Sequence, residues 1–220
     1  MKRIIFLTSG LVLFFGCFAL MTNAAEPEAA TDAGWVSLFN GENLDGWVQI
    51  NGTADYKVED GVIVGTTAEG SPNSFLCTKQ LYGNFVLEFD VKVDDRLNSG
   101  VQVRSNSFPE YQNKRVHGYQ VEIAADGFSG FVYDEARRGR WLSQERCDKE
   151  ASDQAFKKGE WNHYLVICVG DHIMTWINGV AIADVVDAMT KVGFIGLQVH
   201  SFRGDTPAQV RWRNIRIREL

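Results

Sequence analysis

The sequence has few prolines and no stretch with the apolar spacing of an amphipathic helix. Its four prolines, at positions 27, 72, 109 and 207, all lie outside the segments in which apolar and polar residues alternate. Proline cannot donate to a strand ladder, and strict alternation is typical of half-buried strands. Without crossover helices a parallel α/β fold is excluded, so we expect an all-β chain.

Cysteine is scarce as well, with four residues in a chain of 220 and no C-x-x-C pair. Cys168 lies in the apolar stretch "YLVICVG" and is expected to be a buried thiol. Cys77 and Cys147 could form a disulfide in an oxidising compartment, and the sequence leaves that open.

Basic residues are fewer than acidic ones, 22 against 28, which gives a net charge of −6. A nucleic-acid partner is therefore not expected, because binding to phosphates needs a basic surface. Glycine-rich phosphate loops, the G-x-S-x-G elbow and the ligand spacings of zinc sites are also missing. The function must rest on a different kind of site.

The N-terminus carries an export signal. Two basic residues precede an apolar run at positions 4–21, and "TNA" then offers a small-residue cleavage site. We expect residues 1–24 to be a signal peptide, 25–33 a flexible leader and 34–220 one domain, secreted or periplasmic and without a membrane attachment after cleavage. A retained membrane anchor is the alternative, and lipidation of Cys17 is disfavoured because two phenylalanines stand close before it.

Short alternating segments separated by turn signals are what the sequence has in number. Gly170-Asp171 and Asn178-Gly179 are two-residue hairpin signals between apolar runs. Many short strands with tight turns predict an antiparallel two-sheet sandwich of the jelly-roll type. The expected strands are 35–39, 56–58, 62–66, 74–78, 84–93, 100–105, 118–124, 130–134, 163–169, 172–177, 180–186, 193–201 and 210–220.

Three of these segments place large hydrogen-bonding side chains opposite their apolar residues. We call these side chains the polar face, and they are Gln102, Arg104, Gln120, Glu122, Gln198 and His200. An ordinary solvated sheet face is one interpretation. However, none of the six is a lysine, and all can bond to hydroxyl groups. We therefore favour a groove that binds a ligand.

Several motifs together resemble the 3-keto-disaccharide hydrolase family. They are "LFNGENLDGW" (38–47), "NSGVQVRS" (98–105), "GYQVEI" (118–123), "WNHYLVICVGDHIMTWINGV" (161–180), "GFIGLQVHS" (193–201) and "VRWRNIRIREL" (210–220). The resemblance covers the whole mature chain in order. It implies a concanavalin A-like sandwich, an exported protein, and a substrate that is a glycoside or oligosaccharide oxidised to a ketone at C3 of a sugar ring.

Such a substrate sets the chemistry. A C3 ketone acidifies the C2 hydrogen, so removal of that proton expels the glycosidic oxygen at C1. We therefore assign His200 as base or acid, Glu122 as its acid/base partner and Arg104 as the cation for the ketone or enolate oxygen. Gln102, Gln120 and Gln198 would bind sugar hydroxyls. Glu122 and His200 could share a divalent metal ion, although no cofactor is certain.

The charged run "YDEARRGRW" (133–141) supplies further candidates. Asp134, Glu135 or Arg138 could touch the substrate from the rim of the groove, and Trp141 could stack on a sugar ring. A solvated turn is the alternative. For the whole chain, the main rival to an enzyme is a non-catalytic carbohydrate-binding module, and a protein-binding domain is the third possibility. The sugar, its linkage and the oligomeric state are open.

Overall fold

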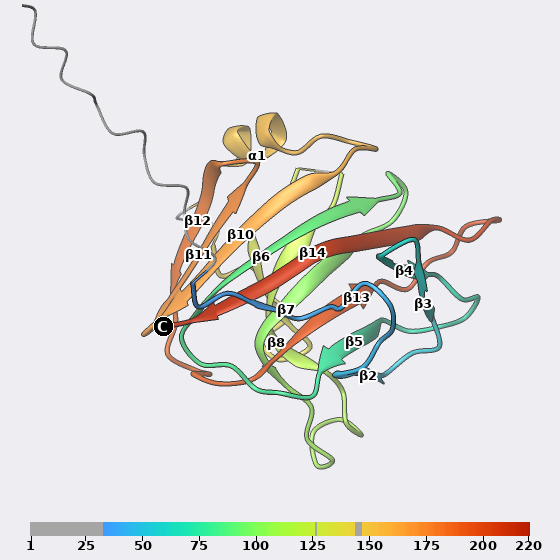
Figure 1. Cartoon of the computed structure of the whole chain (residues 1–220), viewed down its shortest axis with the longest axis horizontal. Helices are drawn as coiled ribbons and strands as arrows, with labels where there is room; N and C mark the ends of the chain where they lie inside the picture. The colour runs from blue at the N-terminus through green and yellow to red at the C-terminus, as the bar shows by residue number, and fades with distance from the viewer. Residues whose placement is uncertain (1–32, 126, 144–146) are drawn as a thin grey trace, which may run out of the picture. The chain divides into compact units, whose positions relative to one another are not determined.

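The computed structural model describes residues 33–220 except 126 and 144–146. The predicted signal peptide and all of the leader but its last residue lie outside these residues. Within them, the chain forms two antiparallel sheets that pack face to face (Figure 1). The prediction of an all-β antiparallel two-sheet sandwich is confirmed.

Sheet order brings together strands that are far apart in the sequence. The eight-stranded sheet runs in the order β12 (Val180–Val186), β11 (His172–Ile177), β10 (Asn162–Val169), β6 (Phe85–Val93), β14 (Gln209–Glu219), β4 (Val62–Thr66) and β3 (Asp55–Glu59), with β1 (Val36–Ser37) beside β14. The six-stranded sheet runs in the order β2 (Trp47–Ile50), β5 (Ser74–Thr78), β13 (Phe194–Val199), β7 (Ser99–Asn106), β8 (His117–Ile123) and β9 (Val132–Glu135).

The core lies between the two sheets and follows the alternation of the strands. Phe89 of the eight-stranded sheet and Val101 and Val121 of the six-stranded sheet are fully buried in one apolar cluster. Tyr119 and Ile123 share that side of β8. Because the core takes one face of the six-stranded sheet, the other face is available for polar side chains.

Two elements were not expected from the sequence. The short helix α1 (Lys149–Ala155) begins at Asp148, whose side chain accepts a hydrogen bond from the backbone N–H of Ala151. This N-cap stabilises a helix too short to show helical periodicity. Strand β2 was also missed, because a four-residue strand gives little alternation to read.

The three described cysteines bear on the disulfide that the sequence left open. Cys77, Cys147 and Cys168 are all free, and Cys77 and Cys168 are buried. The pairing of Cys77 with Cys147 that the sequence left open is therefore not formed.

In the part of the chain that the structure describes, no helix has the length and apolar character needed to cross a membrane.

Candidate functional site

Three glutamine side chains meet on the face of the six-stranded sheet that is turned away from the core. Gln102 and Gln198 donate from Nε2 to Oε1 of Gln120, over 2.7 and 2.8 Å. All three are buried. We call them the amide row. The structure thus brings together the three glutamines that the sequence placed on one face, while their role in binding sugar stays a prediction.

Glu122 extends the amide row along β8. Nε2 of Gln120 donates to one carboxylate oxygen of Glu122 over 2.9 Å, and Asn98 donates to the other oxygen. Gly100 faces Glu122 in the β7–β8 ladder and leaves room for this arrangement. A Cβ atom at Gly100 would lie 2.6 Å from Cγ of Gln120. Glu122 therefore links the amide row, through Gln120, to Asn98.

One acceptor of the amide row has no partner. Oε1 of Gln198 is buried and makes no hydrogen bond to any residue that the structure describes. Buried polar atoms are rarely left without a partner. The amide row therefore holds one unsatisfied acceptor, and this atom is shielded from the surface.

The segment between β7 and β8 packs against the same face. Val116 lies in a small apolar cluster with Phe75 and Phe194, which belong to β5 and β13. The backbone N–H of Val116 donates to Oδ1 of Asn51 over 2.7 Å, and Nδ2 of Asn51 donates to the carbonyl of Lys114 over 3.2 Å. This segment thus covers part of the face that the sequence presented as an open groove.

A pocket of about 520 Å³ lies beside the amide row. Phe75 in its wall is the cross-strand partner of Gln198. Its ionisable lining residues are Glu135, His200 and Arg115. Asn51, Gly52, Pro72, Asn73, Gln112 and Ser201 complete it. We call it the Glu135 pocket, and it combines an acid, a histidine and a cation at a size that suits a small ligand.

Glu135 has a perturbed acidity. Burial raises the pKa of its carboxyl, while the charges of Arg115 and His200 and a hydrogen bond from Asn73 oppose that rise only in part. The guanidinium of Arg115 lies 3.9 Å from a carboxylate oxygen of Glu135. A carboxyl group with a raised pKa in a pocket is suited to acid–base work.

His200 has one ring nitrogen committed to the backbone. Its Nδ1 lies 2.8 Å from the carbonyl oxygen of Ser201. A carbonyl can only accept, so Nδ1 carries the proton and Nε2 is the basic nitrogen of the neutral ring. The predicted candidate His200 thus lies in the Glu135 pocket with a free basic nitrogen.

The prediction that Arg104 lies on the polar face is wrong. Arg104 has a left-handed φ of 47°, and the β7–β8 register shifts between Val103 and Asn106. This bulge turns the side chain away from Gln102. The guanidinium donates to the carbonyls of Gly83 and Gly170 over 2.7 and 2.8 Å.

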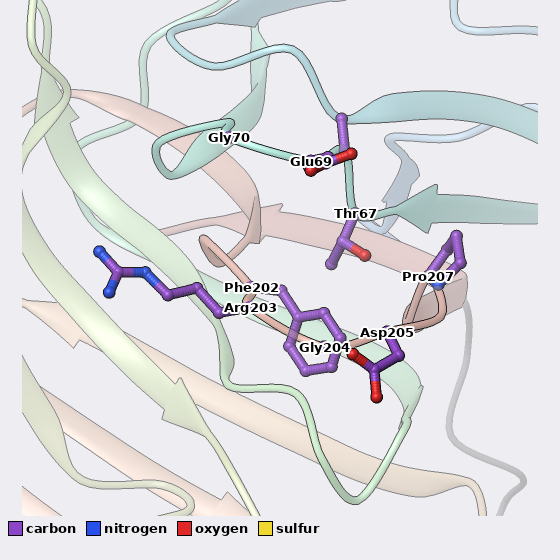
Figure 2. Close-up of a pocket in the computed structure, with 9 residues that line it drawn as sticks. Thr67, Glu69, Gly70, Phe202, Arg203, Gly204, Asp205 and Pro207 are labelled. Atoms are coloured by element: carbon purple, nitrogen blue, oxygen red, sulfur yellow. The ribbon is translucent and has the colours of Figure 1, made fainter.

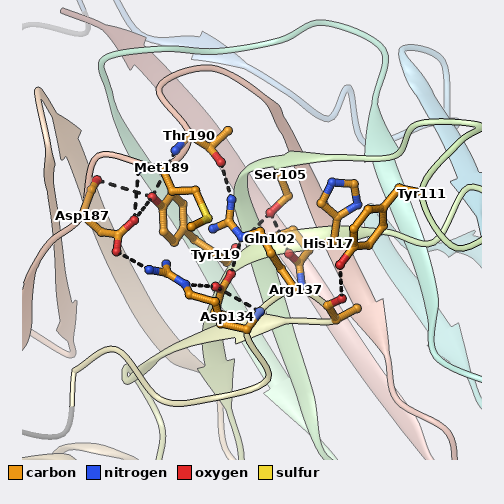
Figure 3. A network of polar contacts seen from close by, with 12 residues as sticks. Gln102, Ser105, Tyr111, His117, Tyr119, Asp134, Arg137, Asp187, Met189 and Thr190 are labelled. Atoms are coloured by element: carbon orange, nitrogen blue, oxygen red, sulfur yellow. Dashed lines mark hydrogen bonds and ion pairs between the residues drawn. The ribbon is translucent and has the colours of Figure 1, made fainter.

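Asp134 and Arg138 also differ from expectation, because they lie in a buried ion network and do not line the Glu135 pocket (Figure 3). The Asp134 carboxylate is fully buried, pairs with Arg138 and accepts from Arg137 over 2.8 Å. Nη1 of Arg138 also donates to Asp187 over 2.7 Å. Asp134 pairs with the core residue Tyr119 in the β8–β9 ladder, which places this network on the core side of β9.

Trp141 belongs to an aromatic cluster. One face of its ring stacks on Phe128 at 5.0 Å, and Phe131 and Tyr133 meet it edge to face. The stacking face expected to receive a sugar is thus occupied by Phe128. The proposed role of Trp141 in sugar stacking stays untested.

The metal-binding expectation for Glu122 and His200 finds no cluster to support it. In residues 33–220, leaving out 126 and 144–146, no group of three or more histidine, cysteine and carboxylate side chains is placed to hold a metal ion. The two oxygens of Glu122 accept from amide groups, as described above. The residues present therefore do not fit a site of this kind.

Sequence reasoning had missed Arg115, and it had offered Glu135 only as one of three rim residues that could touch the substrate. Arg115 follows an exposed segment with three left-handed residues, Gln112, Asn113 and Lys114, and no alternation reveals where such a loop returns. Glu135 stands in the charged run that was recognised as a rim loop. Its position in the strand indicated where it lies, because Asp134 and Glu135 must point to opposite faces of β9.

The class of this domain follows from comparison with known proteins. A family model described as the 3-keto-alpha-glucoside-1,2-lyase-like domain matches residues 34–218. The chain belongs to this family, as the motifs of the sequence suggested. It is a carbohydrate-related domain of the glycosyl hydrolase-like class.

Solved structures with the same fold agree with this assignment. A proposed glycosyl hydrolase from Parabacteroides distasonis has 25% identity and a TM-score of 0.59, covering 84% of this chain and 99% of that chain. Another from the same organism has 20% identity and a TM-score of 0.62, covering 85% and 94%. A carbohydrate-binding module from Bacillus subtilis has 16% identity and a TM-score of 0.57, covering 79% and 96%. No curated protein matches the sequence significantly.

Proposed function

We propose that this protein cleaves 3-keto-glycosides by elimination, with or without the later addition of water. The family assignment and the two Parabacteroides distasonis neighbours support a sugar-cleaving activity. The observation that carries the proposal is the Glu135 pocket, in which a basic histidine, a carboxyl of raised pKa and an arginine line one cavity.

The reaction needs three groups. A base takes the C2 proton, and that electron pair forms the C1–C2 double bond as the C1–oxygen bond breaks. An acid gives a proton to the departing oxygen, and a cation stabilises the charge that builds on the C3 oxygen. Water that adds across the new double bond would complete a net hydrolysis.

The residues of the Glu135 pocket can fill these roles. Nε2 of His200 takes the C2 proton, because Nδ1 donates to the carbonyl of Ser201. Glu135 protonates the leaving oxygen, since burial raises the pKa of its carboxyl and keeps it protonated to higher pH. Arg115 takes the electrostatic role that we first gave to Arg104.

The amide row would bind the sugar beside these groups. The unpartnered Oε1 of Gln198 can accept from a hydroxyl once a shift of neighbouring side chains exposes it, and Phe75 joins the amide row to the wall of the pocket. Glu122, first assigned as an acid or base, instead holds the amide row in place. Its replacement would then act mainly on binding of the substrate and so on KM.

The test uses the purified protein with a 3-oxidised disaccharide and its unoxidised parent, with and without chelator, and follows the products by mass spectrometry. Cleavage of the oxidised sugar alone is the expected result. Loss of cleavage with chelator would show that the reaction needs a metal ion, although the described residues form no cluster of three or more ligands for one. Cleavage of both sugars, or of neither, would overturn the proposal.

A non-catalytic carbohydrate-binding module is the second candidate. The buried amide row favours it, because such a row can bind hydroxyls without chemistry, and a carbohydrate-binding module is among the structural neighbours. Tight binding of the oxidised and parent sugars without any turnover would establish this alternative.

A further inference from the structure

A second pocket, of about 440 Å³, is drawn in Figure 2. We call it the Phe202 pocket. It is formed by two loops, one between β4 and β5 and the other between β13 and β14. Its lining residues are Thr67, Ala68, Glu69, Gly70, Phe202, Arg203, Gly204, Asp205 and Pro207.

The three charged side chains of the Phe202 pocket are free to bind. Glu69, Arg203 and Asp205 are exposed and make no ion pair or side-chain hydrogen bond within the part of the chain that the structure covers. Charged side chains elsewhere on this surface, such as Asp94 and Arg96, are paired. Two carboxylates and a guanidinium give acceptors and donors that suit a ring of hydroxyl groups.

Phe202 gives the pocket an apolar wall, and its ring is held in place. The guanidinium of Arg96 lies over the ring, 5.7 Å from its centroid, and is itself fixed by Asp94 and Thr206. Gly204 makes room for the ring, because a Cβ atom there would lie 2.3 Å from Cε1 of Phe202. A fixed aromatic ring between polar groups is a surface on which the apolar face of a sugar can lie.

The two pockets are lined by successive stretches of the same two loops. His200 and Ser201 line the Glu135 pocket, and the chain enters the Phe202 pocket at the next residue. The Cα atoms of His200 and Phe202 are at most about 7 Å apart, from the reach of two extended residues. The backbone N–H of Ser201 donates to Asn73 over 2.9 Å, which fixes the two loops to each other at this boundary.

We propose that the Phe202 pocket is a subsite for a further, neutral sugar unit of the substrate. This inference rests on the proposed function, because it places the scissile bond in the Glu135 pocket. The preferred substrate is then a 3-keto-oligosaccharide longer than a disaccharide. The extra sugar lies against Phe202 and bonds to Glu69, Arg203 and Asp205.

The experiment compares a 3-oxidised trisaccharide with a 3-oxidised disaccharide of the same linkage. We expect kcat/KM to be about tenfold higher for the trisaccharide, the factor that corresponds to one or two charged hydrogen bonds. Arg203→Gln and Glu69→Gln, both exposed, should remove most of that advantage and leave the disaccharide unchanged. Arg140→Gln, at another exposed arginine, is the matched control and should change neither substrate.

Calorimetric binding of the unoxidised trisaccharide and disaccharide separates this inference from the proposed function. Tighter binding of the trisaccharide that is lost in Arg203→Gln supports the subsite even if no sugar is cleaved, in which case only the proposed function fails. Equal values for the two sugars, or equal effects of Arg203→Gln on both, would overturn the subsite. Phe202→Ala should act like Arg203→Gln if it folds.

Discussion

Nη2 of Arg104 donates a hydrogen bond of 3.0 Å to the side-chain oxygen of Asn84, and so joins the six-stranded sheet to the end of a strand in the opposite sheet. The same guanidinium also donates to two backbone carbonyls, of Gly83 and Gly170. Arg104 is thus a buried link between the sheets. Its chemistry is that of a structural cation with all its bonds made inside the fold.

Arg104→Met should destabilise the protein strongly. Three partly buried hydrogen bonds from the buried guanidinium would be lost, which costs about 3 kcal/mol. Urea unfolding measures the loss, and Arg140→Met at an exposed arginine is the control. The folded variant should keep its kcat/KM for the 3-oxidised disaccharide. A stable Arg104→Met protein without activity would show that Arg104 touches the substrate after all.

His200→Ala should lower kcat/KM for the 3-oxidised disaccharide by about 10²- to 10⁴-fold, since a general base contributes that much. Circular dichroism and the melting temperature should be nearly unchanged, because the ring is only partly buried. His163→Ala is the control, at an exposed histidine that bonds to Asp90 on the eight-stranded sheet. Full turnover by His200→Ala would remove the assigned base.

Glu135→Gln should change how stability depends on pH. The pKa of the folded-state carboxyl is raised from its ordinary value of 4.5, so the folded protein binds this proton more tightly than the unfolded chain does. Stability supplied by the protonated form is therefore lost as pH rises through the folded pKa. The variant should gain stability relative to the natural protein over that window.

The measurement is the difference in melting temperature between Glu135→Gln and the natural protein, from about pH 4 to pH 8. Glu110→Gln, at an exposed glutamate, serves as the control substitution. If the difference for Glu135→Gln did not change with pH, the raised pKa would be refuted. Activity of the variant should fall as well, since glutamine cannot donate the proton to the leaving group.

Asn51→Ala should loosen the segment between β7 and β8. It removes both hydrogen bonds that tie Val116 and Lys114 to Asn51, worth about 1 kcal/mol each. Hydrogen exchange over residues 107–116 should quicken, and KM should rise because Arg115 is carried by this segment. Asn43→Ala, whose bonds stay within its own turn, is the control. Unchanged exchange would mean that the apolar cluster around Val116 holds the segment alone.

Asp134→Ala should cost about 3–5 kcal/mol, because it leaves the partly buried Arg137 without its carboxylate and Arg138 with Asp187 alone. Asp153→Ala removes an exposed pair with Lys149 and should cost less than about 1 kcal/mol. Equilibrium unfolding gives both values. Comparable small losses in the two variants would show that the network in Figure 3 adds little to stability.

The sequence predicted most of the fold because alternation is a local property. The segments at 62–66, 74–78, 172–177 and 180–186 coincide with observed strands, since each is a short apolar-rich or alternating run bounded by turn residues. Helix α1 depends on one capping residue, Asp148, and β2 is a short edge strand, so neither leaves a strong pattern.

The candidate site was predicted only in part. Alternation correctly placed Gln102, Gln120 and Gln198 on one face, where their side chains meet. It failed at Arg104, because a single bulge residue reverses the direction of a side chain. It had no means of showing that Arg115 returns to the pocket of His200, since that contact depends on the path of a loop.

The sequence by itself determined the two-sheet sandwich, the family and the face on which polar groups gather, because period-two patterning and motif order are written along the chain. The tertiary structure alone decided which charges meet. Loop closure through Asn51, the bulge at Arg104 and the sides of β9 bring Glu135, Arg115 and His200 together and send Arg104 and Asp134 elsewhere. These outcomes depend on packing between residues far apart in the chain, which no local pattern encodes.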